Sequence, residues 1–141
     1  MEDLYRLVSG AAAALAGWFA PVAPLAACVF GFIAVDFVTG AAASRAAARR
    51  EGRPWWFESA EAWRTVQKLA LVTTGIVMAW ALDRHVLDFM ELHAARLFTG
   101  FACGVEFWSF LENAAQLSEA PVFRWLKRYV HRRIRKEAGD A

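Results

Sequence analysis

Three carboxylates stand inside stretches of this chain that are otherwise apolar. Asp36 interrupts the apolar run over residues 22–43, and Glu106 and Glu112 lie toward the end of the run that begins at Leu97. A carboxylate in hydrocarbon costs about 3 kcal/mol or more, so such groups usually face a protein interior or a water-filled path. There they can hydrogen-bond another helix, hold a cation or take up a proton. Because a small chain offers them few partners, we expect copies of the chain to meet and share them.

Further polar residues lie on the same helical faces as these carboxylates. At 3.6 residues per turn, Glu106, Ser109 and Asn113 fall within about 60° of one another. The residues for which we expect interhelical polar contacts, or a place along an aqueous lumen, are Asp36, Thr39, Glu106, Ser109, Glu112 and Asn113. For Asp36, a single hydrogen bond that holds the helices in register is an equally good interpretation.

Glycines mark possible close contacts between helices. Gly40 shares the face of Asp36, and Gly100 and Gly104 form a G-x-x-x-G on roughly the opposite face from Glu106. Small residues at this spacing let two helices approach closely in lipid. We therefore expect helix packing at Gly40, Gly100 and Gly104, although a chain rich in Ala and Gly also produces this spacing by composition alone.

The sequence predicts that the elements which position these residues are helices. The chain has 141 residues, and 58% are apolar, against roughly 45–50% in ordinary soluble domains. Its apolar blocks cover residues 4–20, 22–43, 69–82 and 97–111, with no strand alternation and no hairpin signal. The sequence therefore predicts an all-α fold, and a helical integral membrane protein is favoured over a soluble helical bundle.

The membrane interpretation sets approximate spans. A crossing helix needs about 20 predominantly apolar residues, which the third block reaches only when Trp63 and its neighbours are included. We predict three transmembrane helices at about residues 22–43, 63–82 and 97–113, with a fourth, N-terminal helix that is interfacial or re-entrant. Residues 1–118 would form one helical membrane domain, and residues 119–141 a cytoplasmic, basic, amphipathic tail.

Aromatic and basic residues flank the predicted spans. Trp and Tyr favour the headgroup region, and Lys and Arg extend their stems toward it. The expected interface anchors are Trp55, Trp56, Trp63, Trp80 and Trp125. We expect Arg64 and Lys68 to reach outward in the same way. For the Trp55-Trp56 pair, the simplest interpretation is an anchor without a specific partner.

Charge orients the chain. Residues 44–68 carry six basic and three acidic groups, residues 83–96 two and three, and residues 119–141 seven and three. Positively charged loops stay in the cytoplasm. The sequence therefore predicts a multi-pass membrane protein, with its N-terminus outside and its C-terminus in the cytoplasm.

The tail places basic residues opposite apolar ones on a helix. We expect it to lie on the anionic inner leaflet through Arg124, Lys127, Arg128, Arg132 and Arg135. Because the aromatic residues lie opposite the basic face rather than among it, we do not expect nucleic acid as a partner.

Signatures of catalysis or of a cofactor are missing from the sequence. It contains no glycine-rich phosphate loop, no nucleophile elbow and no zinc spacing. We therefore expect neither enzymatic activity nor a cofactor or metal. Cys28 and Cys103 both lie in apolar runs, and small packing residues are a better interpretation of them than a disulfide or redox site.

Two short motifs resemble those of a known family. Asp36-Phe37-Val38-Thr39-Gly40 closes an early span, and Glu106-Phe107-Trp108-Ser109-Phe110-Leu111-Glu112-Asn113 closes the last one. Ser59 and Lys68 precede the middle span, and Pro121 opens the tail. In this order the features resemble the toxin-secretion and phage-lysis holins, over roughly residues 29–126. Residues 60–64 depart from the family pattern, which often has a glycine-containing turn there.

The resemblance implies a function. Holins are small membrane proteins, so the chain would homo-oligomerise in the inner membrane and permeabilise it, for lysis or for release of a lytic enzyme or toxin. Two alternatives stay open from the residues alone. The chain could be an ion or proton channel or small transporter that uses its buried carboxylates, or a structural membrane subunit that recruits a soluble partner through its tail.

Overall fold

Five α-helices make up the chain in the computed structural model, which describes residues 1–87, 89–90, 92–118 and 120–139, without the side chains of Lys127 and residues 137–139. The helices are α1 (Glu2–Phe19), α2 (Ala23–Arg50), α3 (Ser59–His85), α4 (Ala94–Leu117) and α5 (Pro121–Gly139). No strand occurs in these residues. The predicted all-α fold is confirmed.

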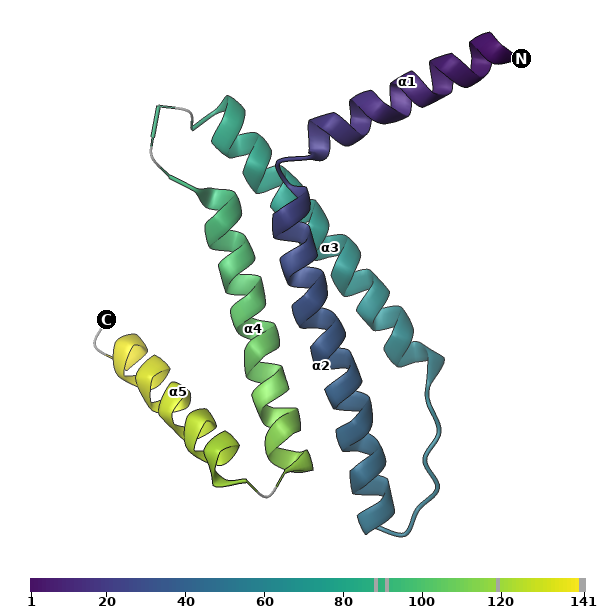
Figure 1. Ribbon diagram of the computed structural model, residues 1–141. Coiled ribbons are helices and arrows are strands. Elements are labelled where there is room, and N and C mark those ends of the chain that lie inside the picture. Colours follow the sequence, from purple (N-terminus) through teal and green to yellow (C-terminus); the bar gives the residue numbers. More distant parts are fainter. Residues whose placement is uncertain (88, 91, 119, 140–141) are drawn as a thin grey trace.

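The helices α2, α3 and α4 run antiparallel to their neighbours in sequence and form a three-helix bundle (Figure 1). The contact of α4 with α2 is the most extensive, followed by that with α3. Val29 and Ile33 of α2 meet Ile76 of α3 in the apolar core, where each side chain is almost fully buried. Burying side chains of this size contributes about 1.5–3 kcal/mol each in water. Within lipid the same contacts act mainly through close packing.

Local sequence explains where the long helices begin and end. Pro24 stands in the first turn of α2, where its missing N–H is not needed. Gly52 adopts a φ of +67° just after α2, a conformation that other residues rarely take. The chain then turns through residues 51–58, which include Pro54, and α3 begins at Ser59. The turn therefore returns the chain antiparallel beside α2.

The opposite end of the bundle is held by a carboxylate and a close contact. Asp83 of α3 accepts hydrogen bonds from the backbone N–H groups of Ala94 (2.8 Å) and Ala95 (2.9 Å), which belong to the first turn of α4. These donors have no partner inside their own helix, and a negative charge at a helix N-terminus is favourable. Nearby, a Cβ atom on Gly75 would come within 2.5 Å of the Phe98 ring. Gly75 therefore permits α3 and α4 to pack as they do.

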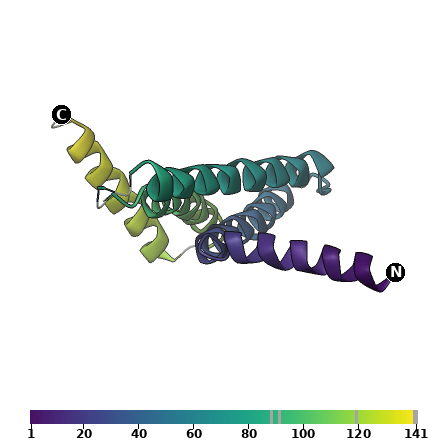
Figure 2. The same ribbon diagram turned by 90° about the horizontal axis from the view of Figure 1, so that it is seen from above.

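The first and last helices project from the bundle on opposite sides (Figure 2). The helix α1 buries no residue, and it meets the bundle through Trp18, whose ring lies 5.7 Å from that of Trp80 in α3. The helix α5 packs against α4: Phe123 lies 6.4 Å from Phe110, and His131 lies 6.1 Å from Trp108, measured between ring centroids. The predicted tail thus contacts the bundle along the second half of α4.

Two of the helices, α2 and α3, are long and apolar enough to cross a membrane. Their 28 and 27 residues correspond to about 42 and 40 Å of helix, against a hydrocarbon core of about 30 Å. These are the helices that contain the predicted spans at 22–43 and 63–82. The third predicted span, at 97–113, lies within α4, and its crossing remains a proposal.

Candidate functional site

A lysine bridges two carboxylates between the three helices of the bundle. The Lys68 Nζ atom of α3 donates to Glu106 Oε2 of α4 at 2.9 Å and lies 3.8 Å from Asp36 Oδ2 of α2. The Glu106 side chain is 6% exposed and that of Asp36 14%, whereas that of Lys68 is 43% exposed. One ammonium group therefore neutralises charge from both neighbouring helices.

An asparagine completes the cluster. Asn113 of α4 donates from Nδ2 to Asp36 Oδ1 at 3.0 Å, and more weakly to the Asp36 carbonyl at 3.5 Å. Thr39, one turn along α2, donates its hydroxyl hydrogen within its own helix, to the carbonyls of Val35 (2.8 Å) and Asp36 (3.0 Å). A hydroxyl group bonded in this way has its donor paired within α2. It therefore does not occupy the Asp36 carboxylate, which stays available to the other helices. We call Asp36, Lys68, Glu106 and Asn113 the charged cluster.

The expectation that Lys68 extends outward to the headgroups is wrong. Its ammonium group points into the bundle because two carboxylates there offer a stronger partner than solvent at the helix end. Sequence gave no signal for this direction, since a lysine at the edge of an apolar run usually extends toward water. With all three groups ionised, Asp36, Lys68 and Glu106 carry a net charge of −1.

The charged cluster lies closer to one end of the bundle than to the other. From Lys68 to Leu82 the helix α3 rises about 21 Å, whereas from Lys68 back to Trp63 the distance is about 8 Å. The near end is the one that carries the 51–58 turn and the start of α5 (Figure 1). A charge close to a membrane boundary is cheaper than one at the midplane, because water and headgroups can reach it.

These contacts overturn the premise from which self-association was inferred. We expected the carboxylates to lack partners within one chain, but Lys68 and Asn113 of the same chain bind Asp36 and Glu106. Burial without a partner therefore does not force copies of the chain together. The cluster instead links α2, α3 and α4 within one chain. Contacts between copies of the chain would therefore use another surface.

Two further residues predicted for the polar surface, Ser109 and Glu112, lie on α4. Glu112 lines a cavity at the corner between α4 and α5, together with Arg124 and Arg128. Ser109 is partly exposed on α4. No group of three or more His, Cys, Asp or Glu side chains suited to a metal occurs in the described ranges.

The three glycines predicted to pack have different surroundings. A Cβ on Gly40 would lie 3.4 Å from Asn113 Nδ2, so this glycine makes room for the charged cluster. A Cβ on Gly100 or Gly104 would meet nothing within 4 Å. The G-x-x-x-G of α4 therefore packs against nothing in the described part of this chain and forms an open surface.

The predicted interface anchors are distributed over both ends of the bundle. Trp56, Trp63 and Trp125 are more than half exposed. Trp55 and Trp80 are partly buried: Trp55 lies beneath Arg45, and Trp80 against Trp18. Among the tail residues predicted to meet the inner leaflet, Arg124, Arg128, Arg132 and Arg135 are exposed. The side chain of Lys127 lies outside the described structure.

Sequence reasoning missed a contact between the two cysteines. Cys28 of α2 and Cys103 of α4 are free thiols whose sulfur atoms lie 3.9 Å apart. They are separated by 75 positions, and no local pattern pairs residues so distant. Both are free thiols, in keeping with the interpretation as small packing residues, and they lie side by side at the α2–α4 contact.

Comparison with known proteins decides the family. The sequence pattern of the bacteriophage holin family matches residues 13–132, which include all of α2, α3 and α4 and most of α5. The chain belongs to the bacteriophage holin family. The match covers every residue of the charged cluster. A search of curated proteins and a search of solved structures each gave no match.

Proposed function

We propose that this holin assembles laterally into homo-oligomers in the bacterial inner membrane and permeabilises it, for lysis or for release of a lytic enzyme or toxin. Membership of the holin family carries the proposal. Two helices able to cross a membrane support it, α2 and α3.

The helix α4 would cross the membrane together with α2 and α3. Its 24 residues correspond to about 36 Å, enough for the hydrocarbon core. The residue that most disfavours insertion of α4 into a membrane is Glu106. That carboxylate is paired with Lys68 and buried against the neighbouring helices rather than against lipid. Polar groups are tolerated within a membrane when they face the bundle interior and find partners there.

The distribution of charge along the bundle supports the proposed orientation. The basic segment 44–68 and the start of α5 lie at one end of the bundle, and residues 83–87 and 92–96 lie at the other (Figure 1). The positive end would face the cytoplasm. On this arrangement α1 lies at the outer face of the membrane. The helix α5 packs against the second half of α4 through Phe123 and His131, so it would have to turn away from α4 to lie along the anionic inner leaflet.

We infer that α4 offers the assembly surface. Gly100 and Gly104 present bare backbone, and the neighbouring Leu97 and Phe101 are more than two-thirds exposed. A second copy could approach this face closely without displacing any side chain. Because Glu106 lies on the opposite side of α4, assembly here leaves the charged cluster intact. A lumen lined by the cluster residues then requires the Lys68–Glu106 pair to open toward water.

Inducible expression in bacteria tests the proposal. We expect growth to stop after induction, with loss of signal from a membrane-potential dye and release of a cytoplasmic enzyme. The double variant Gly100→Leu/Gly104→Leu should reach the membrane at the same level but release at least tenfold less enzyme. The matched control is Gly10→Leu/Gly17→Leu, because these glycines are equally open but lie on α1. Harmless expression of a protein that is strictly monomeric in detergent would refute the proposal.

The charged cluster favours a second candidate function. A lysine and two carboxylates inside an apolar bundle also suit a pathway for protons or small ions. Such a protein would dissipate the membrane potential without releasing the enzyme.

A structural subunit that recruits a soluble partner through α5 is a third candidate. Deleting residues 122–141 would abolish recruitment, whereas a pore formed by α2–α4 would persist.

A further inference from the structure

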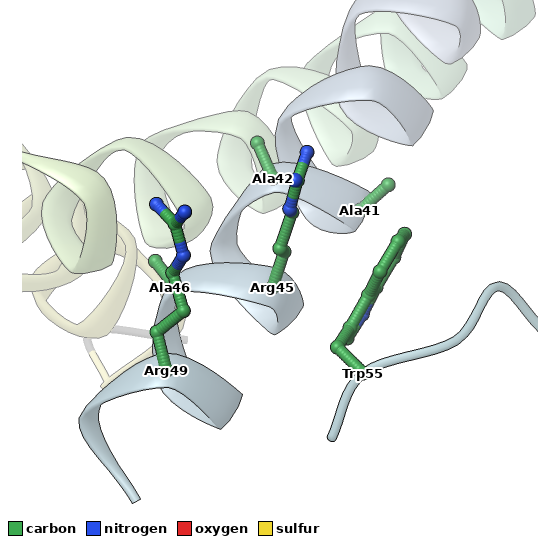
Figure 3. Close-up of a pocket in the computed structure, with 6 residues that line it drawn as sticks. All are labelled: Ala41, Ala42, Arg45, Ala46, Arg49 and Trp55. Carbon is green, nitrogen blue, oxygen red and sulfur yellow. The ribbon is translucent and has the colours of Figure 1, made fainter. Parts of the chain in front are cut away.

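A basic cavity lies at the end of α2, away from the charged cluster. It is lined by Ala41, Ala42, Arg45, Ala46, Arg49 and Trp55, with a volume of about 440 Å³ (Figure 3). The turn after α2 brings Trp55 back beside the helix, where its indole N–H donates to Ser44 Oγ at 3.2 Å. Arg45 lies over the Trp55 ring, with 5.8 Å between the guanidinium carbon and the ring centroid.

The two arginines are held close together by the helix. Arg45 and Arg49 are four residues apart on the same face of α2, and Figure 3 shows both side chains extending to the same side of the helix. Like charges at this spacing repel and destabilise a helix. Within the part of the chain that the structure describes, neither guanidinium has a carboxylate within 4.0 Å, and Glu51 is engaged by Arg53. An anion between the two arginines would relieve this repulsion.

The rest of the cavity lining is suited to the glycerol and the first acyl carbons of a phospholipid. The alanines at positions 41, 42 and 46 carry only methyl groups, so they leave apolar space beside the helix. Trp55 is partly buried and offers an indole of the kind that settles at the headgroup level. Guanidinium groups match pairs of phosphate oxygens with two parallel N–H donors. The cavity thus combines donors for a phosphate with a wall for glycerol and acyl carbons.

We propose that this cavity binds the phosphate of one anionic glycerophospholipid from the inner leaflet. Arg45 and Arg49 hold the phosphate, and Trp55 covers the glycerol and the first acyl carbons. The site rests on the proposed membrane placement of α2, with its basic end in the cytoplasm, but not on pore formation. Basic pockets on that side of a membrane are known to select anionic headgroups. Trp55 is then part of a lipid site rather than an anchor without a partner.

Native mass spectrometry of the full chain in detergent tests this site, with phosphatidylglycerol and phosphatidylcholine as probes. We expect one phosphatidylglycerol to be retained per chain and no phosphatidylcholine. Each surface-proximal Arg contributes about fivefold to binding of an anionic lipid, so Arg45→Ala/Arg49→Ala should weaken phosphatidylglycerol affinity about 25-fold. The matched control is Arg84→Ala/Arg96→Ala, which removes the same charge from two exposed arginines at the opposite end of the bundle.

The neighbouring tryptophans separate a specific site from general attraction. Trp55→Leu should weaken retention about threefold, whereas Trp56→Leu, whose side chain is exposed, should leave it unchanged. Equal losses in the two double-arginine variants, or in the two tryptophan variants, would overturn the proposal. So would displacement of the lipid by an equal concentration of glycerol phosphate, because the site would then bind free phosphate. Circular dichroism confirms that each variant keeps its helices.

The outcome is independent of the proposed pore. An Arg45→Ala/Arg49→Ala variant that loses phosphatidylglycerol but still releases the cytoplasmic enzyme supports the lipid site and leaves the pore in place. A wild-type protein that retains phosphatidylglycerol but is harmless on expression would refute the pore and leave the lipid site standing. Retention of both lipids alike by the wild-type protein would overturn the lipid site alone.

Discussion

Replacing Lys68 with methionine tests whether one ammonium group stabilises both buried carboxylates. Methionine keeps an unbranched apolar stem and a high helix propensity, so the main change is loss of the charge. Removing one partner of a buried ion pair costs about 3–5 kcal/mol, because the other charge stays buried without compensation. The Lys68 side chain is 43% exposed, so solvent already screens part of its field. We therefore expect a loss of about 2–3 kcal/mol in the free energy of unfolding.

A double-mutant cycle with Glu106→Gln isolates the interaction. The glutamine keeps the shape of the side chain, and Lys68 retains Asp36 at 3.8 Å, so this variant alone should lose about 1–2 kcal/mol. In the double variant one buried carboxylate and its cation disappear together. The two losses should therefore not add, and the coupling free energy should be about 1–2 kcal/mol.

Reversible unfolding in mixed micelles, driven by rising SDS and followed by far-UV circular dichroism, measures these free energies. Arg64→Met is the matched control, because Arg64 is an exposed cation one turn away on the same helix. It should change the free energy of unfolding by less than about 0.5 kcal/mol. The reasoning is refuted if the Lys68 and Glu106 effects add to within about 0.4 kcal/mol, or if Arg64→Met is as damaging as Lys68→Met.

Three further predictions concern contacts between the helices. Gly75→Ala should lower the free energy of unfolding by about 1–3 kcal/mol, because the new methyl group overlaps a phenylalanine ring of α4; Gly31→Ala, in open space on α2, should be neutral or stabilising in the same SDS titration. Mild oxidation should join Cys28 to Cys103 within one chain, since their sulfur atoms lie 3.9 Å apart; intact mass should fall by about 2 Da, and thiol labelling should be lost. Asp83→Ala should cost about 1–2 kcal/mol by uncapping α4, seen as faster amide hydrogen exchange in the first turn of that helix.

Each of these has a contradicting outcome. Equal stability of the Gly75 and Gly31 variants would mean that α3 and α4 do not approach as closely as described. Disulfide-linked dimers as the sole oxidation product would place the two cysteines apart within one chain. Unchanged exchange at the start of α4 in the Asp83 variant would show that its carboxylate does not hold that turn.

Local patterns in the sequence were enough to predict the all-α fold class. The apolar blocks predicted helices. The helix α2 extends beyond its predicted span to Arg50, since Arg and Ala continue a helix after the apolar run has stopped, and α3 begins earlier than predicted, at Ser59, through Ala60, Glu61 and Ala62. Such signals depend on neighbours within a few positions, which is why they could be interpreted without a structure.

The partners within the charged cluster could not be found in this way. Asp36 and Glu106 were identified because a charge in an apolar run is conspicuous, but nothing local shows that Lys68 turns inward to them. The Cys28–Cys103 contact depends in the same way on how α2 lies against α4. Contacts between residues far apart in sequence are set by the packing of whole helices, and a single sequence does not record them.

Release of size-graded fluorescent dextrans from liposomes tests the central claim most directly. The liposomes contain purified full-length protein in a mixture of phosphatidylethanolamine and phosphatidylglycerol, at rising ratios of protein to lipid. If this holin permeabilises membranes by assembling, both a small dye and large dextrans should escape, with a steep dependence on that ratio. Passage of protons or small ions without any dextran, or no release at all, would contradict the claim.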